Sequence, residues 1–188
     1  ALSAEKKCAI YTSLIISENG QNFNRGVFIE PNQKMYIYDK RKTFGLAGED
    51  KVYSSGSDQT IVTYHGWKIN LQICYDLRFP EISANKMEIN EEPLFDVLLY
   101  VANWPDKRAG HWDALLKARA IENQSYVLAC NRVGLDDNKI KYIGGSRGIN
   151  ALGELISKET KTEALIKFQI QKDHLSQIHK QLPFLKDR

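Results

Sequence analysis

The 188-residue chain has few cysteines and nearly balanced charges. Its three cysteines, Cys8, Cys74 and Cys130, are odd in number and far apart, which argues against a disulfide framework and favours a reducing, cytoplasmic setting. The formal net charge is only +3, and the lysines and arginines form no basic block, so we expect no nucleic-acid partner. No apolar stretch approaches the ~18 residues that a membrane-spanning helix needs, so we expect no membrane partner.

Several common functional motifs are also missing. The chain has neither C-x-x-C nor H-E-x-x-H, which argues against a metal site. It contains no glycine-rich phosphate loop, no internal repeat and no low-complexity segment. The four histidines are dispersed along the chain, at positions 65, 111, 174 and 179.

Apolar, β-branched runs dominate what remains. Residues 95–103 are continuously apolar, which is typical of a strand buried on both faces, whereas the apolar residues of 111–124 have helical spacing. This alternation predicts an α/β layered fold in a single domain over residues 1–188. Further strands are expected at 8–17, 25–31 (after a turn at 19–24), 34–40, 60–76 (two strands joined at His65–Gly66), 125–134, 148–157 and 163–170, with a closing helix at 172–182.

The stretch LQICYDLRFPE, residues 71–81, places Cys74 where a strand ends. Pro80 suits the first turn of a following helix, and Glu81 suits the positive end of the helix dipole. Because a helix N-terminus can lower a thiol pKa and favour the thiolate, Cys74 is a candidate nucleophile. Cys8 and Cys130, in apolar strands, read instead as small core hydrophobes, and the same reading is the ordinary alternative for Cys74.

A nucleophilic cysteine needs a base and a site for the oxyanion. Any of the four histidines could form a Cys–His pair, but none has a companion acid nearby in the sequence. Cys74 is flanked by Ile73 and Tyr75, so the glycine-flanked elbow of class I glutaminases is absent. The residues alone therefore leave the identity of the base open.

Five blocks of sequence together carry a resemblance. YDKRKTFGLAGED (38–50), ICYDLRFPE (73–81), LLYVANWP (98–105), HWDALLKARAIENQSYV (111–127) and CNRVG (130–134) resemble the nitrilase superfamily of carbon–nitrogen hydrolases. The match runs over nearly the whole chain and is closest to the omega-amidase branch, the 2-oxoglutaramate amidase-like proteins. The resemblance implies a four-layer α-β-β-α sandwich.

The resemblance also implies a set of catalytic residues. Lys40 matches the lysine of the family, Cys74 its cysteine, and Glu49, seven residues before the loop-closing Gly56, its second glutamate. The family's first glutamate, its general base, belongs to a strand–helix unit that would precede residue 1. We therefore expect an N-terminally truncated chain in which no residue can take that role.

The residue types suit amide hydrolysis. The Cys74 thiolate would attack the amide carbon, and the Lys40 ammonium and the Tyr75 backbone N–H would form the oxyanion hole. Trp104, Arg78 and Arg108 are the candidate substrate-binding residues, and segment 144–154 is expected to form a hairpin at the pocket rim. Ordinary alternatives stay open: Lys40 as a solvated strand-end lysine, Trp104 as a packed aromatic ring and Arg108 as a solvated loop arginine.

By resemblance, the chain would hydrolyse the side-chain amide of a small 2-oxo acid such as 2-oxoglutaramate, without a metal or an organic cofactor. A homodimer is expected. Two alternatives stay open. One is another activity of the superfamily, a carbamoylase or a deaminated-glutathione amidase, and the other is an inactive chain that serves only as a dimerising module.

Overall fold

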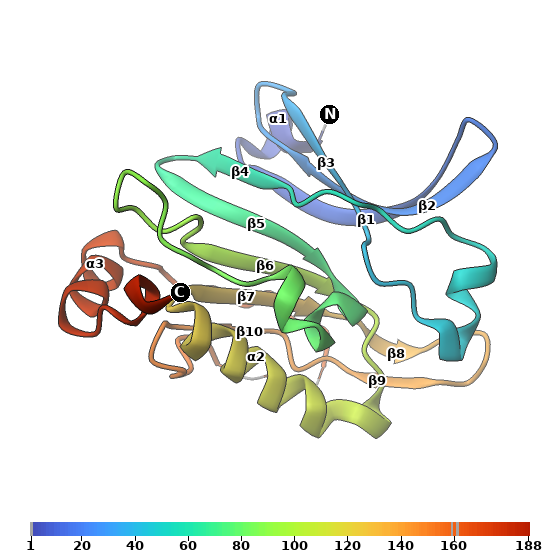
Figure 1. The fold of residues 1–188 in the computed structure, drawn as a ribbon. Helices are drawn as coiled ribbons and strands as arrows, with labels where there is room; N and C mark the ends of the chain where they lie inside the picture. Colours follow the sequence, from blue (N-terminus) through green and yellow to red (C-terminus); the bar gives the residue numbers. More distant parts are fainter. Residues whose placement is uncertain (1, 159, 161) are drawn as a thin grey trace.

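In the computed structural model, which describes residues 2–158, 160 and 162–188, two β-sheets stack face to face (Figure 1). The smaller sheet has three antiparallel strands: β1 (Ile10–Glu18), β2 (Gln21–Ile29) and β3 (Met35–Asp39). Asn19 and Gly20 have φ angles of 51° and 76°, so β1 and β2 join through a two-residue hairpin turn. The predicted turn over 19–24 was therefore too long, and β2 begins at Gln21 rather than at residue 25.

The larger sheet has five strands in the order β10-β7-β6-β5-β4. Its parallel centre explains the continuous apolar runs, because β5, β6 and β7 pack against other elements on both faces. The predicted turn at His65–Gly66 is confirmed, with φ angles of 47° and 77°. The bounds are β4 (Ile61–Tyr64), β5 (Trp67–Ile73), β6 (Val97–Ala102), β7 (Tyr126–Asn131) and β10 (Arg147–Ile149).

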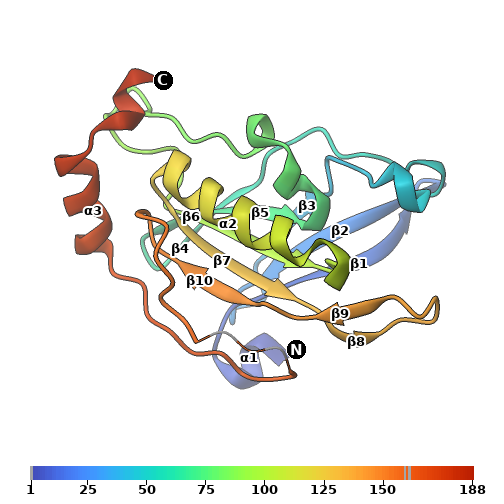
Figure 2. The same cartoon turned by 90° about the horizontal axis from the view of Figure 1, so that it is seen from below.

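The helix α2 (Ala109–Asn123) covers the face of the five-stranded sheet that points away from the smaller sheet (Figure 1). Its apolar stripe, which includes Trp112, Leu116 and Ala120, is buried as the spacing predicts. Figure 2 shows α2 lying across this sheet, with α3 (Lys172–Gln181) at one end of it and α1 (Leu2–Lys6) on the other side of the molecule. Among the described residues, no helix combines the length and apolarity required to cross a bilayer.

Three predictions about local structure were wrong. No α-helix begins at Pro80, and two short 3₁₀ turns, Cys74–Arg78 and Pro80–Ile82, stand there instead. Residues 163–170 form no strand in the described part of the chain, because no neighbouring strand pairs with them there. The predicted strand over 148–157 is reduced to β10 and one bridge, and a two-stranded arm, β8 (Val133–Leu135) with β9 (Lys141–Ile143), follows β7.

Candidate active site

The strand ends of both sheets meet at a pocket of about 580 Å³. Cys74 directly follows β5, Trp104 lies two residues beyond β6, and Lys40 directly follows β3. The carboxyl ends of parallel strands are where open α/β sheets place their ligands. The pocket is lined by all seven residues that the sequence singles out: Lys40, Glu49, Cys74, Tyr75, Arg78, Trp104 and Arg108.

Cys74 sits on a strained turn at the wall of this pocket. Its φ angle is 47°, a left-handed conformation that a non-glycine residue rarely adopts and that is often found at functional sites. The Cys74 Sγ lies 3.8 Å from the Asn103 carbonyl oxygen. The turn that follows it is stabilised by Asp76, whose carboxylate accepts a hydrogen bond from the Ile73 backbone N–H at 2.9 Å.

Burial raises the pKa of the Cys74 thiol, and the nearby Lys40 charge only partly opposes this. The sequence-based prediction that a helix start lowers this pKa was therefore wrong in direction. The prediction failed because the thiol is buried and because a five-residue 3₁₀ turn stands where a helix and its dipole were expected. A thiol in this environment needs a carboxylate or another base to remove its proton before it can attack.

Lys40 is not a solvated strand-end lysine. Its side chain is only 2% exposed and forms an ion pair with Glu49. The same Glu49 carboxylate accepts a hydrogen bond from the Phe44 backbone N–H at 2.7 Å, which ties the loop to the lysine. A buried charge is costly unless it is paired. We therefore interpret Glu49 as the counter-charge that keeps the Lys40 ammonium in the pocket.

The loop between Lys40 and Gly56 closes through a close backbone approach. The Gly56 N–H donates to the Lys40 carbonyl at 3.0 Å, and a Cβ added to Gly56 would lie 2.2 Å from the Asp39 carbonyl oxygen. Only glycine fits there without displacing the end of β3. The family resemblance places a loop-closing glycine seven residues after Glu49, and this close approach gives that glycine a steric explanation.

Asp76 is a residue that the sequence reasoning missed. Besides the bond from Ile73, its carboxylate accepts hydrogen bonds from the Tyr38 hydroxyl at 2.8 Å and the Lys42 backbone N–H at 2.9 Å. Burial raises the pKa of Asp76 to about 6, although these bonds and the Lys40 charge oppose the shift. Asp76 connects the cysteine turn to the lysine segment, and its place within YDLR gave no indication of this role.

Trp104 and Arg78 form one wall of the pocket. Trp104 is buried, lies 5.5 Å from the Trp112 ring and donates its indole N–H to the Arg108 carbonyl at 2.7 Å. The Arg78 guanidinium lies 5.0 Å from the centre of the Trp104 ring and 6.0 Å from that of Tyr75. Trp104 is thus both the packed aromatic and the pocket residue that the sequence left as alternatives.

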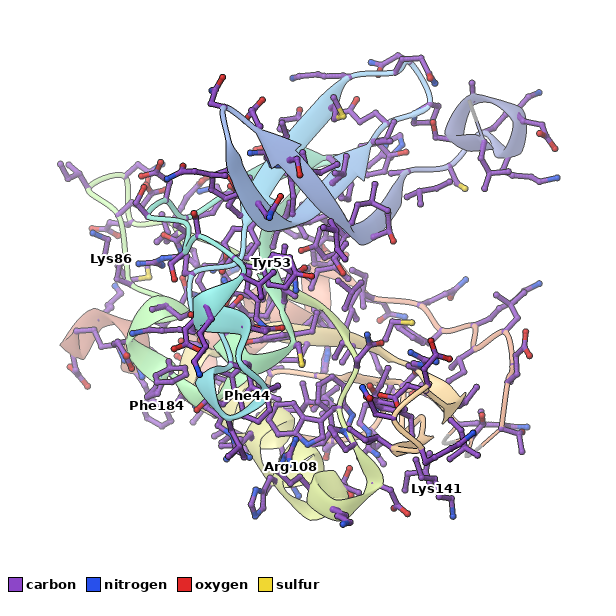
Figure 3. All side chains as sticks on the ribbon, turned by 90° about the vertical axis from the view of Figure 1, so that its right-hand side faces the viewer. Phe44, Tyr53, Lys86, Arg108, Lys141 and Phe184 are labelled. Carbon is purple, nitrogen blue, oxygen red and sulfur yellow. The ribbon has the colours of Figure 1, made fainter. Side chains whose placement is uncertain are left out.

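Arg108 lies beside the loop that follows Lys40. Its guanidinium is 5.2 Å from the centre of the Phe44 ring, and the side chains labelled Phe44 and Arg108 lie near each other in Figure 3. The β8–β9 arm adds Ile140 and Tyr142 to the pocket lining. Segment 144–154 was predicted to form a hairpin at the pocket rim. An antiparallel bridge joins Ile149 to Leu155, but none of the segment's residues, all of which the structure describes, is among those that line this pocket; Gly144, Gly145 and Arg147 line a second pocket of about 190 Å³, which shares Trp104 and Asn131 with it.

Asn131, Arg132 and Cys130 also line the pocket, and the sequence reasoning assigned them no role. The Asn131 side chain accepts a hydrogen bond from the Trp104 backbone N–H at 2.7 Å and donates one to the Trp104 backbone carbonyl at 3.0 Å. Asn131 therefore holds the loop after β6. The quoted block CNRVG contained these residues. Cys130 and Cys8 are exposed, which corrects their interpretation as buried hydrophobes.

The described residues that line the pocket include no histidine. His111 is joined to the pocket residue Arg78, whose Nη2 donates to the His111 Nδ1 at 3.0 Å. His65, His174 and His179 lie in the β4–β5 turn and on α3. A Cys–His pair, left open by the sequence, therefore has no histidine on the pocket wall to use with Cys74.

Residues 1–180 match the family described as carbon-nitrogen hydrolase. Similar curated proteins include an omega-amidase from Yersinia enterocolitica, 49% identical over 132 residues, which cover 70% of this chain and 49% of that protein. A 2-oxoglutaramate amidase from Paenarthrobacter nicotinovorans is 33% identical over 88% of this chain and 57% of its own length.

Among solved structures, a CN-hydrolase superfamily protein from Xanthomonas campestris with an arsenic adduct in its active site has a TM-score of 0.95 and 36% identity. The match covers 99% of this chain and 71% of that one. Yeast Nit3, of the nitrilase superfamily, matches with a TM-score of 0.87 at 20% identity, over the whole of this chain and 68% of its own, and shows the fold alone. The chain spans about half the length of the first curated relatives that it matches.

Proposed function

The chain belongs to the carbon-nitrogen hydrolase family, and we propose that it carries the site of an amidase that cleaves the side-chain amide of a small 2-oxo acid. The proposed substrate is 2-oxoglutaramate, which would give 2-oxoglutarate and ammonia. The observation that carries the proposal is the placement of Cys74 in one pocket with a buried Lys40–Glu49 ion pair. The names of the similar omega-amidases and 2-oxoglutaramate amidases support the substrate class.

In the proposed reaction, the Cys74 Sγ attacks the amide carbon while its proton passes to a carboxylate. The negative charge that develops on the amide oxygen is stabilised by the Lys40 ammonium and the Tyr75 backbone N–H. The carboxylate then gives its proton to the leaving ammonia, and a thioester remains on Cys74. The same carboxylate activates water against the thioester, which releases the acid and restores the thiol.

The carboxylate base is the open part of this proposal. Among the described residues, Glu49 is the only carboxylate that lines the pocket, and it is already engaged by Lys40 and the Phe44 N–H. The family resemblance supplies another glutamate, from a strand–helix unit with no counterpart in residues 1–188. We propose that this glutamate is the base and that Glu49 keeps Lys40 charged and in place.

The pocket charge favours an anionic amide. Arg78, Arg108 and Arg132 line it, whereas its one carboxylate in the described part of the chain is neutralised by Lys40. A guanidinium can bind a carboxylate with two parallel hydrogen bonds, and 2-oxoglutaramate carries a carboxylate beside its keto group. We therefore assign Arg78 and Arg108 to the acid end of the substrate and Trp104 to the wall beside it.

Ammonia release from a panel of amides tests the proposal. The panel contains 2-oxoglutaramate, an N-carbamoyl amino acid and deaminated glutathione, with the Cys74→Ala variant as the blank. Preference for 2-oxoglutaramate supports the proposal, and preference for either other compound would assign the site to the corresponding activity. The assay uses the protein together with the segment that carries the proposed base glutamate, so that absence of turnover with every compound would leave the dimerising module. The homodimer, the cytoplasmic location and the single domain over residues 1–188 stay predictions.

A further inference from the structure

We propose that His111 is a positioning residue for substrate binding, which holds the Arg78 guanidinium in the orientation that receives the substrate carboxylate. The inference rests on the proposed function and deepens it. His111 is absent from the pocket wall, so its effect must pass through Arg78.

The first observation is the hydrogen bond between these two side chains. Arg78 Nη2 lies 3.0 Å from His111 Nδ1. A guanidinium has donors but no acceptor, so the imidazole must accept through Nδ1. The bond therefore selects the neutral imidazole with its proton on Nε2, and it fixes one nitrogen of the guanidinium fork.

The second observation is what Arg78 otherwise contacts. The Trp104 and Tyr75 rings lie against the guanidinium, and within the part of the chain that the structure describes no carboxylate forms an ion pair with it. A cation–π contact draws the guanidinium towards the ring but sets no direction for its individual N–H groups. The His111 bond removes this remaining freedom, so that the other N–H groups keep one direction.

The third observation is that the backbone of each support is fixed, while the His111 side chain itself is exposed. Trp104 is buried and held through its backbone by Asn131, and His111 lies on α2, whose Trp112 packs in the core. A receptor for a carboxylate gains affinity when its geometry is set before the ligand arrives. His111 thus contributes affinity without contacting the substrate.

The test compares a charged substrate with its neutral counterpart, 2-oxoglutaramate and its methyl ester. Removal of the imidazole in His111→Ala should raise the KM for 2-oxoglutaramate about fivefold, with little change in kcat. The KM for the methyl ester should stay the same, because the ester has no carboxylate for Arg78 to receive. His111→Asn keeps a side-chain acceptor and should restore part of the affinity. His65→Asn, in the β4–β5 turn, is the matched control.

A double-mutant cycle separates positioning from direct contact. In an Arg78→Ala background, His111→Ala should have no further effect on the KM for 2-oxoglutaramate. An undiminished effect in that background, an equal effect on the ester, or an unchanged KM in the single variants would each overturn the inference. Absence of turnover in the unmodified enzyme with every amide would instead refute the proposed function, so the two failures are distinguishable.

Discussion

Each of the two sheets leads to one of the two proposed reactive residues of the pocket, Lys40 and Cys74, but they hold it in different ways. The last residues of β5, Leu71 to Ile73, are all buried, and they place Cys74 by packing on both sides of the sheet. In β3, buried Tyr38 follows Ile37, which is 43% exposed, and Met35 is 56% exposed. The strand that leads to Lys40 is therefore packed on one face only.

The difference shows what fixes each reactive group. Cys74 is fixed by the hydrophobic core beneath it, whereas Lys40 is fixed by the Glu49 ion pair and by the closure of its loop at Gly56. Asp76 joins the two, since it accepts hydrogen bonds from both segments. We call the turn at Cys74 the cysteine corner and the segment from Lys40 to Gly56 the lysine corner. Substitutions at the cysteine corner should then test the chemical step, whereas those at the lysine corner should also test how the Lys40 side chain is positioned.

The largest effect is expected for Cys74→Ala. Turnover of 2-oxoglutaramate should fall below detection, because the thioester forms on Cys74, and the other thiol in the pocket lining, Cys130, lies in β7 and not on the cysteine turn. The folded structure should persist, since alanine adopts the same backbone region with similar strain. Ammonia release and the unfolding midpoint measure the two parts. Residual turnover above about 1% would show that the nucleophile lies elsewhere.

Next is Lys40→Met, which removes the charge but keeps much of the buried volume. Loss of one oxyanion donor costs about 2.7–4 kcal/mol, so kcat should fall at least about 100-fold. Glu49→Gln is the matched variant, because it leaves the lysine in place without its counter-charge. If Lys40→Met retains a near-normal kcat, the lysine is a structural ion-pair partner and the proposed oxyanion hole is wrong.

The cysteine corner was largely predictable from the sequence, and the lysine corner was not. The continuous apolar run before Cys74 indicated a buried strand with a polar turn after it, and β5 with its 3₁₀ turn confirms this. Lys40 lies at the start and Glu49 in the middle of a loop without periodicity, so only the family resemblance singled them out. Their ion pair depends on a loop path that no local pattern encodes.

The errors have the same origin. Pro80 and Glu81 predicted a helix after Cys74. Instead, the buried Asp76 carboxylate accepts three hydrogen bonds, which stabilise a tighter turn. Residues 163–170 have the composition of a strand, yet no neighbouring strand pairs with them in the described residues, and Leu165 is 83% exposed. Local composition predicts the type of an element only where the tertiary structure provides its partner.

A pH-dependent effect is expected at Asp76, which links the two corners. Its pKa rises from 3.8 to about 6 in the folded protein, so the folded state binds more protons than the unfolded state between these values. The contribution of this carboxyl to the free energy of unfolding is therefore largest below pH 4 and falls by about 3 kcal/mol as the pH rises through 6.

Denaturant unfolding of the wild type and Asp76→Asn at several pH values measures this contribution. The stability advantage of the wild type over the variant should shrink between about pH 4 and pH 6, because the amide does not ionise. A constant difference across this range would mean that Asp76 has an ordinary pKa. It would also remove the evidence that burial, rather than the surrounding donors, dominates its environment.

The smallest effect is expected on the outer face of the three-stranded sheet. Ile37→Thr keeps a β-branched residue in β3 and changes a side chain that is 43% exposed, so the free energy of unfolding should shift by about 0.5 kcal/mol or less. Leu71→Ala, in β5, is the contrasting variant and should cost about 2–5 kcal/mol, since Leu71 is fully buried. Near-equal losses in the two variants would break the comparison between the sheets. They would mean that the outer face is covered in solution, and coverage by a second copy of the chain predicts that the loss of stability shrinks as the protein is diluted.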